Sequence, residues 1–163
     1  RNVVVMRTLS KLGLAGLRLG FLVGTAEWLG ELDKLRLPYN VNALTQIAAT
    51  VALEHLDVLT DQARAILAER SPLATALAEL PGVTVFPSDA NFITFRVPSA
   101  IGTFAGLKAR KVLIKNLHGA HPLLANCLRV TVGTPAENRA FLDALTAALR
   151  GVEETAATSP REQ

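Results

Sequence analysis

The chain has 163 residues, of which 50% are hydrophobic and 19% are charged, and its formal net charge is +3; this composition suits a globular protein with a real core. Its lysines and arginines are dispersed and its aromatic residues are few, which argues against a nucleic-acid partner. No apolar run reaches the ~20 residues of a membrane span, so no membrane partner is expected. The single cysteine, Cys127, excludes an internal disulfide, and we expect a reducing, cytoplasmic compartment.

The first third of the sequence predicts two strands and two helices. Val3–Met6 is an unbroken apolar run, which is typical of a strand buried on both faces. Gly20–Gly24 is a second apolar run, bounded by glycines, and predicts another buried strand. Thr25 can cap a helix that extends to about Leu35. After a loop, apolar residues at helical spacing predict a helix over 42–54.

A long helix is expected next, and its course past Pro72 is open to two interpretations. In the first, Ser71 caps and Pro72 opens a new helix. In the second, which a family resemblance given below implies, one helix continues through the proline and bends. A proline inside a helix costs roughly 3 kcal/mol, so the second interpretation predicts a kink over 68–71.

The remainder alternates short strands and helices, as expected for a compact α/β unit. The expected elements are strands over 83–86, 91–97, 112–115 and 127–132, a helix over 100–110 and a turn over 118–122. Thr134-Pro135-Ala136-Glu137 has the pattern of a capping box with proline at the first helical position, and predicts a final helix. From Gly151 onward, small, polar and charged residues predict a disordered tail.

A cluster of functional side chains follows the first strand. Thr8, Ser10, Lys11 and Arg18 are interspersed with glycines, which let the backbone approach a ligand closely. Ligands of open α/β sheets bind beyond the carboxyl ends of strands, and hydroxyls with an arginine suit a phosphate. A partly desolvated lysine can form a Schiff base with an aldehyde. The combination indicates pyridoxal phosphate, which carries both groups; the alternatives are turn capping by the hydroxyls and a solvent-exposed lysine and arginine.

Arg129 stands between apolar neighbours in the last predicted strand. A buried arginine is costly unless its charge is paired, so it indicates either an internal acid partner or an anionic ligand. His118 and His121 lack further metal-ligating residues at suitable spacing and are interpreted as turn residues, so no metal is expected.

The stretch Arg7–Gly20 resembles the Schiff-base lysine motif of fold-type I pyridoxal-phosphate aminotransferases, above all that of the histidinol-phosphate aminotransferases. The resemblance runs in family order from about Arg1 to Arg150 and also covers Leu37–Asn42, Ser88–Phe92 and Leu128–Thr134. It implies an α/β fold: the end of the large-domain sheet over 1–57, then a linking helix and a small α/β domain over 58–150, and a tail over 151–163.

On the cofactor side, the resemblance implies that Lys11 binds the aldehyde of pyridoxal phosphate and later moves a proton between the substrate and the cofactor. Thr8, Ser10 and Arg18 would bind the cofactor phosphate. The interval from Lys11 to Arg18 is one residue shorter than is usual in the family, which implies a tightened loop.

On the substrate side, the resemblance implies that Arg129 binds the α-carboxylate and that Lys115 binds a substrate phosphate. Further substrate-binding candidates are Tyr39, Asn40 and Asn91. Four of these five have a plain alternative: an internal salt bridge for Arg129, an exposed strand lysine for Lys115, a half-buried ring for Tyr39, and satisfaction of the backbone at a strand start for Asn91.

The implied reaction exchanges an amino group between L-histidinol phosphate and 2-oxoglutarate in histidine biosynthesis, in a homodimer whose active sites use both subunits. Because the sequence opens in a strand, we interpret it as the C-terminal piece of a longer protein, with the aspartate and the aromatic residue that hold the cofactor ring upstream. One alternative is a folded but inactive fragment that self-associates through unpaired strand edges. The other is a sister enzyme of the same fold, such as a threonine-phosphate decarboxylase or an aromatic aminotransferase.

Overall fold

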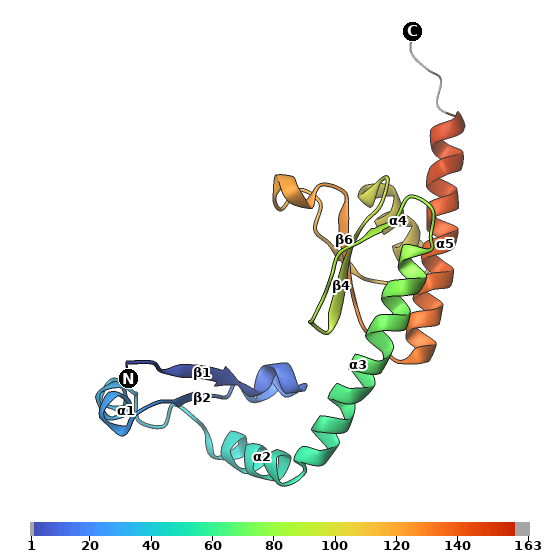
Figure 1. The fold of residues 1–163 in the computed structure, drawn as a ribbon. Helices are drawn as coiled ribbons and strands as arrows, with labels where there is room; N and C mark the ends of the chain where they lie inside the picture. Colours follow the sequence, from blue (N-terminus) through green and yellow to red (C-terminus); the bar gives the residue numbers. More distant parts are fainter. Residues whose placement is uncertain (1, 159–163) are drawn as a thin grey trace. The chain divides into compact units, whose positions relative to one another are not determined.

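The computed structural model describes residues 2–158, with side chains for residues 2–152, and Figure 1 shows its ribbon. The chain groups into two compact units, Arg1–Ala63 and Arg64–Gln163. Each unit holds one sheet, two-stranded in the first and four-stranded in the second. Within the described range, no helix is both long enough and apolar enough to cross a membrane.

The first unit begins with a hairpin of two short strands. Strand β1 (Val5–Thr8) pairs antiparallel with β2 (Gly20–Val23). The second predicted strand is confirmed, and the first is displaced, because only Val5 and Met6 of its predicted range lie in β1. A side chain at Gly20 would place its Cβ 2.9 Å from the backbone oxygen of Arg7. The close approach of the two strands at this end therefore requires a glycine.

The prediction that both strands are buried on both faces is wrong. Val5, Met6 and Phe21 keep 44%, 79% and 50% of their surface exposed. A strand is buried on both faces only where other elements cover each face of its sheet, and the described elements of this unit leave both strands exposed. Among the described residues of this unit, only Leu9 and Ala49 are buried. The apolar runs form strands whose side chains stay accessible.

Two helices follow in the first unit, α1 (Ala26–Asp33) and α2 (Ala43–Glu54). Thr25 holds the extended backbone of a capping position before α1, although its side chain makes no capping hydrogen bond. Asn42 caps α2 fully, because its Oδ1 accepts a hydrogen bond from the backbone nitrogen of Thr45 at 2.9 Å. Both predicted helices are confirmed.

Helix α3 (Leu56–Ala78) is continuous and contains Pro72. The interpretation in which Ser71 caps a new helix is therefore wrong. Leu73 and Leu77, which follow the proline, are 2% and 0% exposed and belong to the main core. Their burial offsets the hydrogen bond that the proline cannot donate. The bend expected just before the proline stays a prediction.

The second unit is built on an antiparallel sheet with the strand order β3-β4-β6-β5. Its strands, all at or beside predicted ones, are β3 (Thr84–Val85), β4 (Phe92–Arg96), β5 (Lys115–Asn116) and β6 (Cys127–Thr131). The predicted strand over 112–115 is displaced, because only its last residue lies in β5.

Alternation along β4 and β6 sends apolar side chains to one face of the sheet. Ile93, Phe95 and Val130 are 1%, 0% and 5% exposed. They join one core cluster with helices α4 (Ala100–Ala109) and α5 (Pro135–Thr158), which lie on one side of the sheet (Figure 1). Burial of each such side chain stabilises the fold by about 1.5–3 kcal/mol, so this unit has the core that the first one lacks.

Helix α5 begins at the predicted capping box. The Glu137 Oε2 accepts a hydrogen bond from the backbone nitrogen of Thr134 at 2.8 Å, and the backbone nitrogen of Glu137 donates to the Thr134 Oγ1 at 3.3 Å. The hydrogen bonds that the Thr134 backbone and then its hydroxyl give to the carboxylate lower the pKa of Glu137 below its ordinary value of 4.5.

The prediction of a disordered tail from Gly151 is wrong as far as Thr158, because α5 continues to that residue. Extending an existing helix avoids the cost of nucleation, and the alanines and glutamates of this stretch favour the helix. Residues 159–163 lie outside the described part of the chain.

We expect the capping box to make stability depend on pH. Because folding lowers the pKa of Glu137, its carboxylate contributes stability above the ordinary value of 4.5 and loses that contribution as the pH falls through the lowered value. Glu137→Gln should therefore reduce the free energy of unfolding at about pH 7, and the deficit should shrink towards about pH 3. Urea unfolding measures both values.

The exposed Glu79 of the same unit provides the control. Glu79→Gln should show no deficit that changes with pH. A deficit of Glu137→Gln that stays constant from neutral to acid pH would contradict the prediction.

Candidate active site

The predicted phosphate-binding hydroxyls sit in a tight turn after β1. Thr8 precedes the 3₁₀ turn η1 (Leu9–Leu12), and its Oγ1 accepts a hydrogen bond from the backbone nitrogen of Ser10 at 3.1 Å. The same hydroxyl donates to the Leu19 carbonyl at 3.2 Å, and the Thr8 and Ser10 hydroxyls are hydrogen-bonded to each other. Turn capping by Thr8 is thus confirmed, and it places the two hydroxyls side by side.

Arg18 ends a second 3₁₀ turn, η2 (Ala15–Leu17), with a left-handed backbone φ of 52°. Few residues other than glycine adopt this conformation. Its backbone nitrogen donates to the Ala15 carbonyl at 3.3 Å, which closes the turn. The two successive turns form the compact loop between Lys11 and Arg18.

Thr8, Ser10 and Arg18 line one open hollow of about 1140 Å³ in the first unit, and Asn40 lines it from the loop before α2. Two hydroxyls, a guanidinium and an amide are donors that suit a phosphate. Part of the remaining wall is apolar and includes Phe21. The structure brings three of the four predicted cofactor-binding residues to one wall.

Lys11 follows Ser10 in η1, but its side chain is exposed and does not line this hollow. Lys11 is thus next to Ser10 in the sequence, but its side chain lies outside the hollow that Thr8, Ser10 and Arg18 line. Its catalytic role stays a prediction.

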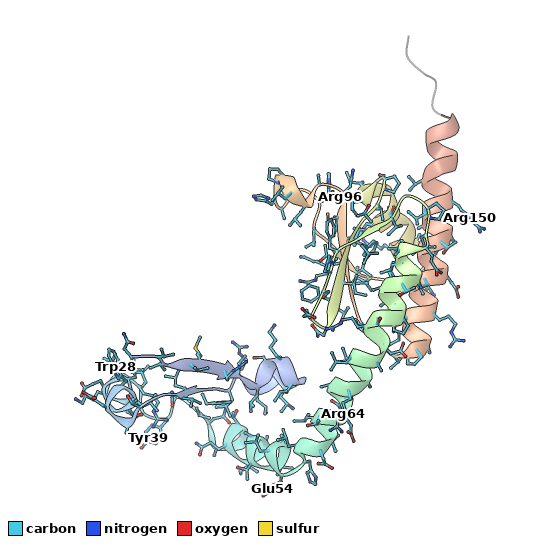
Figure 2. The ribbon with its side chains drawn as sticks, in the orientation of Figure 1. Trp28, Tyr39, Glu54, Arg64, Arg96 and Arg150 are labelled. Carbon is cyan, nitrogen blue, oxygen red and sulfur yellow. The ribbon has the colours of Figure 1, made fainter. Side chains whose placement is uncertain are left out.

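Tyr39, labelled in Figure 2, is 98% exposed and has a positive φ of 59°, so the interpretation of a half-buried ring is wrong. Tyr39 and Asn40 line a second open hollow of about 630 Å³ together with Ala49 and Thr50 of α2. Residues held in such backbone conformations cluster at functional sites. A substrate-binding role for this loop stays a prediction.

Arg129 lies on the face of the second unit's sheet that points away from the core. In the ladder it is opposite Thr94 of β4 and Lys115 of β5. Its guanidinium carbon lies 4.6 Å from the centre of the Phe92 ring. Within the described residues, the guanidinium makes no ion pair and no hydrogen bond. The alternative of an internal salt bridge therefore lacks a partner in this part of the chain.

Lys115 and Arg129 are cations directly opposite each other in the β5–β6 pair. Like charges at such positions destabilise a sheet, and an anion bound between them removes the repulsion. Both residues line an open hollow of about 750 Å³ in the second unit. Lys115 is exposed, as its plain alternative expects, yet its place beside Arg129 favours an anion-binding site.

Asn91 precedes β4, and its backbone oxygen accepts a hydrogen bond from the backbone nitrogen of Val132 at 2.9 Å. This bond extends the β4–β6 ladder, but the backbone of Asn91 makes it and its side chain does not, so the alternative of a side chain that satisfies the backbone stays a prediction. A substrate contact by its exposed side chain stays a prediction.

The sequence did not predict the hydrogen-bond network of the Asn138 side chain at the end of β6. The Asn138 amide accepts a hydrogen bond from the Gly133 nitrogen at 2.9 Å and donates to the Gly133 oxygen at 3.1 Å and to the Glu69 Oε2 at 2.9 Å. Asn138 is only 6% exposed. These hydrogen bonds fix the chain just after β6, the strand that carries Arg129. The network could have been suspected from the sequence, because Asn138 is a polar residue on the apolar face of the last predicted helix, one turn before Phe141.

The two histidines act in the turn between β5 and β6. The His118 Nδ1 accepts a hydrogen bond from the Asn126 nitrogen at 3.0 Å, and the His121 Nδ1 accepts one from the Leu123 nitrogen at 3.2 Å. Their interpretation as turn residues is confirmed.

Comparison with known proteins places these features in a family. Residues 1–145 match the family model described as aminotransferase class I and II, and the chain belongs to this family. The predicted fold class is also confirmed: the chain is an α/β part of a fold-type I transferase.

Named relatives give further similarities. The histidinol-phosphate aminotransferase 2 of Cupriavidus pinatubonensis is 60% identical over 149 residues, which are 91% of this chain and 41% of that protein. The structure of the histidinol-phosphate aminotransferase of Sinorhizobium meliloti in complex with pyridoxal-5'-phosphate has a TM-score of 0.77 at 27% identity, covering 93% of this chain and 42% of the other. The L-threonine-O-3-phosphate decarboxylase of Porphyromonas gingivalis has a TM-score of 0.79 at 29% identity, covering 91% and 47%. The chain thus spans about two-fifths of the length of the curated relatives it matches.

Proposed function

We propose that the protein carrying this chain is a pyridoxal-phosphate-dependent aminotransferase that exchanges an amino group between L-histidinol phosphate and 2-oxoglutarate, a step of histidine biosynthesis. Its 60% identity to a protein named for that activity supports the substrate. The observation that carries the proposal is the meeting of Thr8, Ser10 and Arg18 at one hollow, next to Lys11 in the chain.

The donors at this hollow fit the phosphate of pyridoxal phosphate. Arg18 brings a permanent positive charge with donors in a rigid fork. The Thr8 and Ser10 hydroxyls add directed hydrogen bonds when their protons turn to the phosphate from their present acceptors, the Leu19 carbonyl and the Thr8 oxygen. The capping bonds of Thr8 hold these hydroxyls together before any ligand binds. When bound, the cofactor supplies an electron sink for the charge that develops at the substrate α-carbon.

Lys11 is proposed to hold the aldehyde of the cofactor through its Nζ. With the cofactor in place, the Nζ of Lys11 would also serve as the base that takes the proton from the substrate α-carbon.

Arg129 and Lys115 are proposed to bind the anionic groups of both substrates. 2-Oxoglutarate carries two carboxylates, whereas L-histidinol phosphate carries a phosphate and no carboxylate. A guanidinium binds either anion through parallel hydrogen bonds, and an ammonium adds a point charge. Further proposed substrate contacts are Tyr39, Asn40 and Asn91.

We further propose a cytoplasmic homodimer, with residues 1–57 in the cofactor-binding large domain and 58–150 forming the linking helix and small domain. The apolar side chains of the first unit support an assembly that buries more surface, since Trp28 and Leu44 are 50% and 78% exposed. The single reduced cysteine, Cys127, supports the compartment.

Two other candidates each have an observation in their favour. Similarity to the Porphyromonas gingivalis decarboxylase favours a decarboxylase of the same fold. Such an enzyme releases carbon dioxide and needs no 2-oxoglutarate, so substrate profiling separates the two reactions.

The 41% coverage of the first relative favours a folded but inactive fragment when the chain is alone. A chain that gains no colour with added cofactor supports that reading.

Lys11→Ala in the complete protein should abolish transamination, because it removes both the attachment of the cofactor and the base. We expect turnover to fall by about 10³-fold or more, measured as glutamate formed from 2-oxoglutarate. Lys34→Ala is the matched control, since Lys34 is an exposed lysine of the same unit paired with Glu31 at 2.6 Å; it should keep wild-type turnover. Near-normal turnover of Lys11→Ala would rule out the assignment.

Arg129→Lys should raise the KM for 2-oxoglutarate about 10- to 100-fold, because lysine keeps the charge and loses the two parallel hydrogen bonds. Steady-state kinetics in the complete protein measure the change. Arg150→Lys, an exposed arginine on α5, should leave the KM unchanged. An unaltered KM in Arg129→Lys would remove Arg129 from the substrate site.

A further inference from the structure

Two arginine–phenylalanine pairs lie on the sheet of the second unit. The Arg96 guanidinium carbon lies 5.3 Å from the centre of the Phe86 ring, and that of Arg129 lies 4.6 Å from the centre of the Phe92 ring. The strand register explains both pairs. Phe92 is the diagonal neighbour of Arg129 on the adjacent strand. Phe86, one residue beyond β3, is the diagonal neighbour of Arg96. Both rings lie within reach of a long side chain at such a position.

The two guanidinium groups differ in how they use their N–H donors. Arg96, labelled in Figure 2, donates to the carbonyls of Ala125 and Leu123 at 3.0 and 2.9 Å, and so fastens the turn before β6. Arg129 donates to no described residue. Its contact with the ring face is electrostatic and leaves its donors available. The pair of Arg96 and Phe86 is therefore structural, whereas in the pair of Arg129 and Phe92 the guanidinium can still donate hydrogen bonds to a ligand.

We propose that Phe92 is the residue that positions the Arg129 guanidinium for an anionic substrate; the inference rests on the proposed function of Arg129. A long side chain loses rotamer freedom when it binds a ligand. A ring that holds the guanidinium beforehand removes part of that cost, which is preorganisation of the site. A carboxylate in the same place would also hold it but would occupy the donors that the substrate needs.

The neighbouring charges give this positioning a purpose. Lys115 lies opposite Arg129 and repels it, so the ring resists a displacement that the lysine favours. Phe92 is itself fixed: its backbone oxygen accepts a hydrogen bond from the Ser88 Oγ at 2.5 Å, and it pairs with Thr131 in the ladder.

The test compares Phe92→Leu, which removes the ring, with Phe92→Tyr, which keeps it. In the complete holoenzyme, Phe92→Leu should raise the Kd of 2-oxoglutarate, measured by calorimetry, about two- to tenfold. It should raise the KM by a similar factor and change kcat by less than about twofold. Phe92→Tyr should keep both constants near their wild-type values, because it retains the ring face.

Phe86→Leu is the matched control, because the donors of Arg96 are already committed to carbonyls. It should leave the Kd unchanged. In an Arg129→Met background, Phe92→Leu should have no further effect. If Phe92→Leu lowers the unfolding temperature, Phe92→Met, which also lacks the ring, takes its place.

An unchanged Kd in Phe92→Leu, or an equal loss in Phe86→Leu, would overturn the inference. Calorimetric binding does not depend on turnover. A wild-type protein that binds 2-oxoglutarate without transaminating it therefore contradicts the proposed reaction alone, while a weakened Kd in Phe92→Leu still supports the role of Phe92.

Discussion

The pairing of β4 with β6 is the interaction on which the second unit depends, because it sorts side chains into a core and a binding face. Ile93 lies opposite Val130 on the core face, and the next rung, Thr94 opposite Arg129, faces the other way. A shift of the register by one residue would exchange the two faces and bury the Arg129 charge without a partner, which is strongly destabilising. The register that fills the core therefore also places the cation proposed to bind substrate.

The first unit depends on short-range hydrogen bonds more than on burial. Thr8, Ser10 and Arg18, whose side chains can donate hydrogen bonds to a phosphate, line one hollow. Capping by Thr8 and the left-handed conformation of Arg18 bring them there. The apolar side chains of β1 and β2 meanwhile remain exposed. Such a unit presents its functional turn while leaving apolar surface that a larger assembly would bury.

Features with a local cause could be predicted from the sequence. The capping box of Thr134 and Glu137 formed as its spacing required, and the residue types that meet at the first hollow were predicted as a group. Features that depend on distant parts of the chain could not. Whether β1 is buried depends on the elements that cover its sheet, and the described part of the first unit leaves it exposed. Asn138 likewise meets Glu69 only through the folding of residues far apart in the sequence. The contact of Phe92 with Arg129 follows from register, which no periodicity in one strand reveals.

The proposal that Lys11 holds the cofactor beside the phosphate donors is tested most directly by chemical trapping. The complete protein is loaded with pyridoxal phosphate and reduced with borohydride, which makes the bond between lysine and cofactor permanent, and mass spectrometry of its peptides then locates the modification. We expect it on Lys11 alone, with a lower yield in Arg18→Ala because the phosphate loses its cationic partner. Modification of another residue such as Lys34, or of none, would contradict the assignment.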